Sequence, residues 1–276
     1  MKKVKNNIAL LILFAVIFTN TPVMMAEGLR DTVSIPKIII NDFVDAFNDL
    51  LYVGNNVIHT DKDGFLMAAG IVGVTGVSMT FDTTLREIAL KNQSTGADNV
   101  FKITNEFGNG FYGAAFGGAI YLGGLALGDN EVRITGRLIF ESLLLSGAVT
   151  TILKSGFGRA RPYMNTGETD FRFFRTDNSY LALPSGHTTV VYAISSVLAA
   201  RIDKWWSYAG FFAVASLTGG ARIYYDQHWF SDVVLGAAVA TVSGFAVVNA
   251  EKNKKNGLSN LKLIPQPNGL ALIYFF

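Results

Sequence analysis

Six apolar segments rich in glycine and alanine are the strongest constraint on the fold of this chain. Most of them are near or below the roughly 20 residues that a helix needs to span a bilayer comfortably. Small residues at helical spacing, such as Gly113 and Gly117, let helices approach closely, either in membranes or in tight soluble bundles. We therefore expect an all-α fold, a helical bundle of about six core helices. The six segments are residues 65–81, 110–128, 138–153, 188–203, 205–221 and 233–249.

The composition leaves two classes of protein for such a bundle. Half of the 276 residues are hydrophobic and 16% are charged, against about 25% charged residues in average soluble domains. The chain is therefore a membrane protein or an unusually apolar soluble helical protein. A net charge of +2, without a zinc-finger pattern or a basic run, argues against a nucleic acid partner. The absence of cysteine excludes disulfides and thiol chemistry.

The first residues resemble a bacterial secretory signal. A basic start is followed by an apolar run and by a cleavage region that ends at Ala26, which are the three parts of a signal peptide. We expect residues 1–26 to be a cleaved signal, the alternative being an uncleaved anchor helix. Residues 27–64 follow and contain an amphipathic helix over residues 37–52, which packs on the core or lies on a membrane surface.

The helical core is expected to extend over residues 65–250. The tail, residues 257–276, has two apolar stretches on either side of Asn268-Gly269, a dipeptide that favours tight hairpin turns. We therefore expect a small C-terminal β-hairpin packed on the helical body.

Three short polar segments interrupt the apolar pattern and carry the candidate site residues. In the first, Lys154 ends an apolar segment and Arg161-Pro162 follows a loop that contains glycine. Such a loop can direct both cations at one point, where a planar guanidinium and a compact ammonium suit phosphate oxygens. The alternative is a basic loop that only flanks a hydrophobic helix.

The second segment, Pro184-Ser185-Gly186-His187, precedes an apolar run. Ser185 can cap the following helix, whose free N–H groups bind anions, and Gly186 allows close backbone approach. His187 would then lie beside a bound oxyanion, whose charge favours the protonated imidazole of a general acid. The alternative is a capping turn with an incidental histidine.

The third segment contains Arg222, His228 and Asp232. In a helix, His228 and Asp232 share a face, so the carboxylate can bind one ring nitrogen and leave the other free to attack. Arg222 supplies a third cation. The alternatives are an ordinary surface pair, or a helix cap formed by Asp232.

Two other polar residues are less informative. His59 lies outside the three segments, and we expect it to be structural or exposed. Glu141 lies inside an apolar segment, where it would be functional in a bilayer or would serve as a buried hydrogen-bonding group in helix packing.

The three segments together resemble the tripartite signature of the type 2 phosphatidic acid phosphatase and vanadium haloperoxidase superfamily. The match is complete except at Ala221, where the family usually has serine before the arginine. The resemblance extends over residues 65–250 and implies a helical fold around a single phosphate site.

The resemblance also implies a role for each site residue. His228 would be the nucleophile and form a phosphohistidine, and Asp232 would orient it. His187 would protonate the leaving oxygen and then activate water. Neither a metal nor another cofactor would be needed. The phosphoryl oxygens would be held by Lys154, Arg161, Ser185, Gly186 and Arg222.

The leading functional hypothesis is a metal-independent phosphatase that hydrolyses phosphomonoester or pyrophosphate groups. A phosphorylated lipid is the expected substrate, because the apolar body suits an amphiphilic molecule. The alternatives are a soluble periplasmic acid phosphatase of broad specificity and a vanadate-dependent haloperoxidase. The sequence predicts no oligomeric state.

The topology has more than one interpretation. Residues 188–203 and 205–221 form a there-and-back pair, so all three polar segments should meet at one end of the bundle. Lysines follow the last apolar segment at the other end, and the positive-inside rule then places the site on the periplasmic face of the inner membrane. A cleaved signal with six spans would place it inside. Either residues 37–52 are embedded, the first segment does not span, or the body is a soluble periplasmic protein.

Overall fold

The computed structural model of the chain describes residues 35–255, 261–266 and 269–274, and side chains within residues 35–254. The predicted signal at residues 1–26 lies outside this part. The chain divides into two compact units, Met1–Ile38 and Ile39–Phe276. The arrangement given below is that of the second unit.

The body of this unit is helical, which confirms the predicted all-α class. Each predicted apolar segment lies in a helix of its own, and two shorter helices that were not predicted, α4 and α5, follow the first of them. The helices are α2 (Ile35–Ile58), α3 (Lys62–Met79), α4 (Asp82–Lys91), α5 (Thr95–Phe107), α6 (Gly110–Leu127), α7 (Asn130–Phe157), α8 (Gly186–Ile202), α9 (Trp205–Tyr224) and α10 (Phe230–Lys255), with 3₁₀ turns at Pro162–Met164 and Asn178–Tyr180.

Two strands follow the helices. Strand β1 (Leu261–Gln266) pairs with β2 (Gly269–Tyr274) in antiparallel register. Residues 267 and 268, at the predicted turn, lie outside the described residues. The hairpin and its packing on the body therefore stay predictions.

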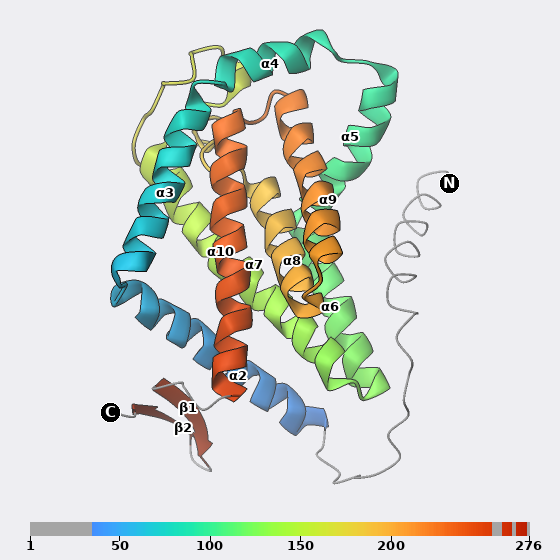
Figure 1. Cartoon of the computed structure of the whole chain (residues 1–276), viewed down its shortest axis with the longest axis vertical. Coiled ribbons are helices and arrows are strands. Elements are labelled where there is room, and N and C mark those ends of the chain that lie inside the picture. Colours follow the sequence, from blue (N-terminus) through green and yellow to red (C-terminus); the bar gives the residue numbers. More distant parts are fainter. Residues whose placement is uncertain (1–34, 256–260, 267–268, 275–276) are drawn as a thin grey trace. The chain divides into compact units, whose positions relative to one another are not determined.

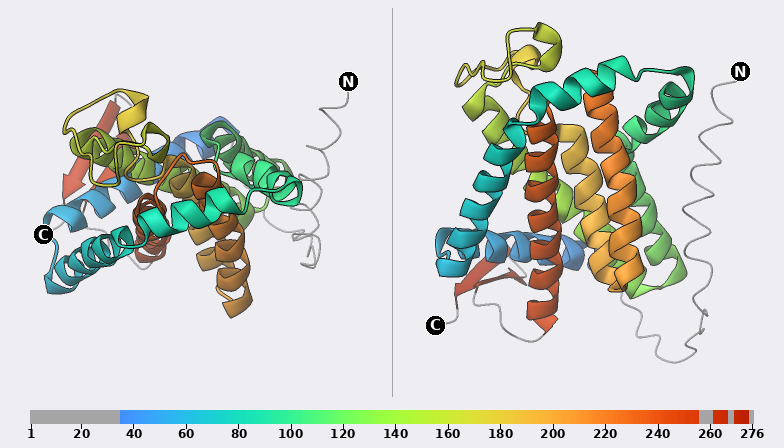
Figure 2. Two further views of the ribbon diagram at one scale, coloured as in Figure 1. Left: turned by 90° about the horizontal axis from the view of Figure 1, so that it is seen from above. Right: turned by 45° about the horizontal axis from the view of Figure 1, so that its top comes forward.

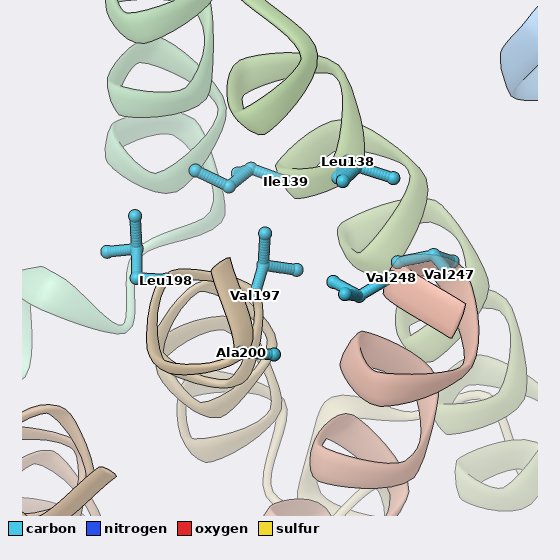
Figure 3. Close-up of a cluster of buried hydrophobic side chains, with 7 residues drawn as sticks. All are labelled: Leu138, Ile139, Val197, Leu198, Ala200, Val247 and Val248. Carbon is cyan, nitrogen blue, oxygen red and sulfur yellow. The ribbon is translucent and has the colours of Figure 1, made fainter. Parts of the chain in front are cut away.

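Helix α7 packs on α6, α8 and α10, and α8 in turn contacts α9 and α10. Where α7, α8 and α10 meet, their side chains are apolar and buried, and they form the cluster in Figure 3. Close van der Waals packing is what holds such apolar helices together in a membrane, so this cluster stabilises the contact between the three helices. The cluster consists of Leu138, Ile139, Val197, Leu198, Ala200, Val247 and Val248.

Helices α7, α8, α9 and α10 alternate in direction, so α7 and α9 end where α8 and α10 begin (Figure 1). Helix α4 crosses this end of the bundle and contacts α9 and α10, as both views in Figure 2 show. Residues 39–58 of α2 lie near the opposite end, where α10 finishes (Figure 1). The bundle therefore has two chemically different ends.

Helix α2 has its charged side turned toward the bundle. Asp42 pairs with Arg133 of α7 and accepts a hydrogen bond from the Tyr121 hydroxyl at 2.7 Å. Asp49 lies 3.3 Å from Arg137. Ion pairs of this kind let a charged face pack on the protein while the apolar face stays outside. The exposed apolar residues of α2 include Ile39, Ile40, Phe43 and Phe47.

Glu141 belongs to this distant end and not to the candidate site. It is buried, with Oε1 3.5 Å from Arg137 Nε. Arg137 in turn donates to Glu251 of α10 at 2.5 Å. Of the two roles considered for Glu141, the contacts support pairing within the helix packing.

Helices α6, α7 and α10 are long and apolar enough to cross a membrane, and α3 with α4, bent by 53° at their junction, would count as a fourth span. By the length and composition of these helices, the chain is a membrane protein. Within the described part, α8 and α9 do not reach the same combination of length and hydropathy. All six predicted segments are therefore helical, but they are not equally able to cross a membrane.

Glycines allow α6 and α7 to touch along their backbones. A Cβ added at Gly124 would lie 2.3 Å from the backbone nitrogen of Arg133, and one at Gly136 would lie 2.4 Å from that of Tyr121. Distances this short require the backbones to move apart. These two glycines therefore allow the predicted close approach of α6 and α7. Gly117, which lies against Ile139, contributes as well.

We predict that Gly124→Ala destabilises the protein by about 1–3 kcal/mol, because the new methyl group overlaps the backbone of α7. Gly123→Ala is the matched control, since a Cβ there meets nothing within 4 Å. It should be neutral or stabilising by up to about 1 kcal/mol through helix propensity. Chemical unfolding in mixed micelles measures both variants, and equal stabilities would contradict the contact.

Candidate active site

The three polar segments meet at one end of the bundle, as the alternation of helices predicts. Lys154 lies in the last turn of α7, and Ser185 and Gly186 open α8. Arg222 lies in the last turn of α9, and Asp232 in the first turn of α10. Residues that are far apart in the sequence therefore share one site because four helix termini coincide.

Lys154 reaches the start of α8. Its Nζ donates to the carbonyl oxygen of Leu181 at 2.5 Å. A Cβ at Gly186 would lie 3.7 Å from Lys154 Cε, so the ammonium stem passes beside the first residue of α8. The cation and the free N–H groups of that helix end are therefore neighbours, which favours binding of an anion.

Ser185 is the N-cap of α8, as predicted, and accepts from the backbone N–H of Thr188. Its own N–H donates to the carbonyl oxygen of Asp232 at 2.8 Å. This bond ties the start of α8 to the start of α10. The second and third polar segments are thus fixed relative to each other by a backbone hydrogen bond.

Two arginines of the site are held by neutral amide oxygens. Arg161 donates to Asn178 Oδ1 at 2.9 Å and to Gln227 Oε1 at 3.0 Å. Arg222 donates to Asn105 Oδ1, on α5, at 2.6 Å. An amide fixes a guanidinium without neutralising it, so both charges remain available to an anion.

Arg222 also has an unused donor. Its Nε is buried and has no hydrogen-bond partner among the described residues. Burial and the nearby Arg161 lower the pKa of Arg222 to about 10, at which it is still charged near neutral pH. A buried donor on a charged group is rare without an acceptor, so the arrangement fits a bound oxyanion.

His187 faces three cations. Burial, then Arg222, Arg161 and Lys154, lower the pKa of His187 to about 4. The imidazole is therefore neutral near pH 7 in the free protein, in contrast to the protonated form expected beside an anion. A bound oxyanion reverses the electrostatic contribution and favours protonation, so His187 becomes an acid only when the site is filled.

His228 and Asp232 form the predicted pair. The His228 Nδ1 atom lies 3.4 Å from Asp232 Oδ2, which is longer than a formed hydrogen bond but usual for a ligand-free catalytic pair. Burial and the three cations hold the pKa of His228 well below its usual value. A neutral imidazole whose Nδ1 faces a carboxylate has Nε2 free as a nucleophile.

Ala221, at the position where the family usually has serine, is fully buried in α9 beside Arg222. Sequence reasoning missed Asn105, Asn178 and Gln227, because single amides carry no motif signal. It also missed Arg159 and Asp82, which contact the third segment from outside it. Arg159 could have been found from the sequence, because it lies inside the first polar segment, between Lys154 and Arg161.

Within the described residues, no group of three or more histidine, aspartate and glutamate side chains is arranged to hold a metal ion. Metal independence stays a prediction. The chemistry available to the residues present is binding of a tetrahedral oxyanion, nucleophilic attack by one imidazole, and proton transfer by the other.

Part of the chain is similar to known proteins. A model of the PAP2 superfamily matches residues 136–256. Lipid A 1-phosphatase of Porphyromonas gingivalis is 37% identical over 109 residues, which are 37% of this chain and 22% of that protein. Lipid A 1-phosphatase of Rhizobium johnstonii is 31% identical over 105 residues, which are 37% of this chain and 42% of that protein. Both matches cover less than half of the relative.

A solved structure shares the helical architecture. The transmembrane PAP2-type phosphatidylglycerolphosphate phosphatase of Bacillus subtilis superposes with a TM-score of 0.51 at 14% identity, over 76% of this chain and 97% of that chain. At this identity the likeness concerns the fold alone.

We predict that the site takes up a proton when it binds an oxyanion. The pKa of His187 is about 4 in the free protein, and a bound anion raises it, so binding should strengthen as the pH falls toward about 4 and then level off. Calorimetry of orthophosphate binding near pH 6, in buffers of different ionisation enthalpy, counts the protons. His187→Gln should take up about one proton fewer than the unmodified protein, and equal uptake would contradict the assignment.

Proposed function

We propose that this chain, whose residues 136–256 match a model of the PAP2 superfamily, is a metal-independent phosphatase that hydrolyses phosphomonoester or pyrophosphate groups of lipids. The observation that carries the proposal is the convergence of three cations and two imidazoles on one buried point. Arg161 and Arg222 keep their charge because amides hold them. Fixed positive charge of this kind stabilises the charge that develops on phosphoryl oxygens.

The proposed reaction has two steps. In the first, His228 Nε2 attacks phosphorus and the bond to the leaving oxygen breaks, while His187 gives that oxygen a proton. In the second, neutral His187 takes a proton from a water molecule, whose oxygen attacks the phosphorus. The bond between phosphorus and His228 Nε2 then breaks, which releases phosphate and restores His228. Asp232 holds the Nδ1 side of His228 in both steps. Lys154, Arg161 and Arg222, with Ser185 and Gly186 at the start of α8, bind the remaining oxygens.

An apolar groove next to the site supports a lipid substrate. It has a volume of about 490 Å³, lies between α3 and the first turns of α10, and is apolar apart from Ser78. Its wall includes Phe230, two residues after His228. A lipid with its phosphate at the site could lay an acyl chain in this groove. The groove is lined by Gly70, Gly73, Val74, Val77, Ser78, Phe81, Phe230 and Val234.

The orientation in the membrane is part of the proposal. We place the protein in the bacterial inner membrane with the site facing the periplasm. The lysines at the end of α10 support this, because the positive-inside rule assigns that end to the cytoplasm. We also propose that the chain consists of a signal at residues 1–26, an N-terminal segment with an amphipathic helix at 27–64, a helical core at 65–250 and a hairpin at 257–276.

We predict that His228→Ala lowers phosphate release by at least about a thousandfold, because the nucleophile is lost. His59→Ala is the matched control: His59 is exposed at the end of α2, remote from the three segments. Its turnover should equal that of the unmodified protein. Malachite-green detection of phosphate from a lipid phosphate in mixed micelles measures both, and a folded His228→Ala protein that retains turnover would refute the mechanism.

A second prediction concerns the effect of filling the groove on lipid binding. Gly73→Leu should fill part of it and raise KM for a long-chain lipid phosphate by about tenfold, the loss expected from about two methylene contacts. The turnover of p-nitrophenyl phosphate, which has no acyl chain, should not change. Gly76→Leu on the same helix is the control, since Gly76 does not line the groove.

If Gly73→Leu leaves the lipid kinetics unchanged, the acyl chain lies elsewhere. If the unmodified protein prefers the aryl phosphate to every lipid tested, the enzyme is an acid phosphatase of broad specificity and not a lipid phosphatase.

A further inference from the structure

We infer that Asp82 and Arg159 form a positioning pair that holds Asp232 in place behind the nucleophile His228. The inference rests on the proposed function. It assigns a role to α4, whose residues lie outside the stretch matched by the family model. Neither residue is assigned to phosphate binding, although Arg159 lies between two cations that are.

Arg159 is fully buried, and each of its donors is used. Nη1 donates to Asp232 Oδ1 and to Ser231 Oγ, both at 2.7 Å. Nη2 donates to Asp82 Oδ2 at 2.7 Å and to the carbonyl oxygen of Glu168 at 2.6 Å, and Nε donates to the same carbonyl at 2.9 Å. A guanidinium has five N–H donors, so none remains for a phosphoryl oxygen.

Two aromatic rings flank the guanidinium. The centroids of Phe171 and Trp229 lie 5.4 Å and 5.6 Å from Arg159 Cζ. Cation–π contact and planar hydrogen bonding both depend on the shape of arginine. This environment differs from that of Arg161 and Arg222, which are held by amides and face the site. Arg159 therefore acts on the reaction through Asp232 and not on the substrate.

Asp82 fixes the pair from the other side. It is fully buried at the start of α4, and its Oδ1 accepts from the backbone N–H of Ser231 at 2.8 Å. Its Oδ2 accepts from Ser231 Oγ at 2.7 Å, in addition to Arg159. Ser231 directly precedes Asp232, so a single carboxylate holds both the first turn of α10 and the arginine that binds Asp232.

The result is that Asp232 cannot turn away from His228. Its Oδ1 is bound by Arg159, and its Oδ2 accepts from the backbone N–H of Trp229 at 2.8 Å while facing His228 Nδ1. A carboxylate fixed in this way favours the tautomer with the proton on Nδ1 and the lone pair on Nε2. Loss of the pair should change the tautomer and the rate of attack, but not the binding of phosphate.

Asp82→Asn tests the inference, because it retains the size of the side chain and removes the charge. We expect kcat to fall about 10- to 100-fold, as for other residues that orient a reacting group. The Kd for orthovanadate should stay within about twofold, since the phosphate ligands are untouched. Arg161→Lys should do the opposite and weaken vanadate binding.

Asp226→Asn is the matched control. Asp226 pairs with Arg86 of α4 at 2.6 Å, near the same loop, but has no contact with Asp232. It should lower thermal stability while kcat stays within about twofold of the unmodified protein. If Asp82→Asn and Asp226→Asn lower stability alike and neither lowers kcat, Asp82 is only structural and the inference is wrong.

A readout without turnover separates this inference from the proposed function. Nitrogen-15 NMR of the ligand-free protein reports the tautomer of each of its three histidines, and His59→Ala and His187→Gln assign His228 by elimination. His228 should carry its proton on Nδ1 in the unmodified protein and become a mixture of tautomers in Asp82→Asn. An unchanged tautomer overturns the inference. A changed tautomer in a protein that forms no phosphohistidine supports the pair and rejects the proposed function.

Discussion

The repulsion between cations that meet in a buried site is the interaction on which the rest of this structure depends. Lys154, Arg161 and Arg222 lie near enough to lower the pKa of His187, and burial adds to the effect. Like charges at such distances drive a site apart unless something holds them. Carboxylates would bind these cations most strongly, but they would also neutralise the charge that an anion needs. The chain uses amide and backbone carbonyl oxygens instead, and so keeps a strong field for an anion.

Because amide oxygens hold the arginines of the site, residues outside the three motifs are needed to form it. The amides come from α5, from the loop before α8 and from the turn before α10. The carboxylate that faces His228, Asp232, accepts hydrogen bonds from Arg159 and from the backbone N–H of Trp229. Other carboxylates gather at the opposite end of the bundle, where Arg137 and Lys254 pair with them. The cluster of Asp49 and Glu251 with these two cations therefore lies away from the anion site.

The sequence predicted the helical body and the meeting of the motif residues, because both follow from local patterns. Apolar segments near the length of a span form helices in most contexts, and alternation of direction brings their termini together. It did not predict α4 and α5, which are short and polar on one side. Nor did it show the amides around Arg161 and Arg222, since such contacts join residues far apart in the chain. The inward charged face of α2 was equally hidden, because a helical pattern shows two faces but not which one packs.

The position of Asp82 limits how this protein can be divided. The model of the PAP2 superfamily matches residues 136–256. Yet the carboxylate that fixes the start of α10 and the amide that holds Arg222 both come from residues before that stretch. A fragment cut to the matched residues would retain each motif but lose two supports of the third one. The smallest independent unit of this protein therefore begins no later than α4, and the third motif, if moved into another scaffold, would need α4 and α5 with it.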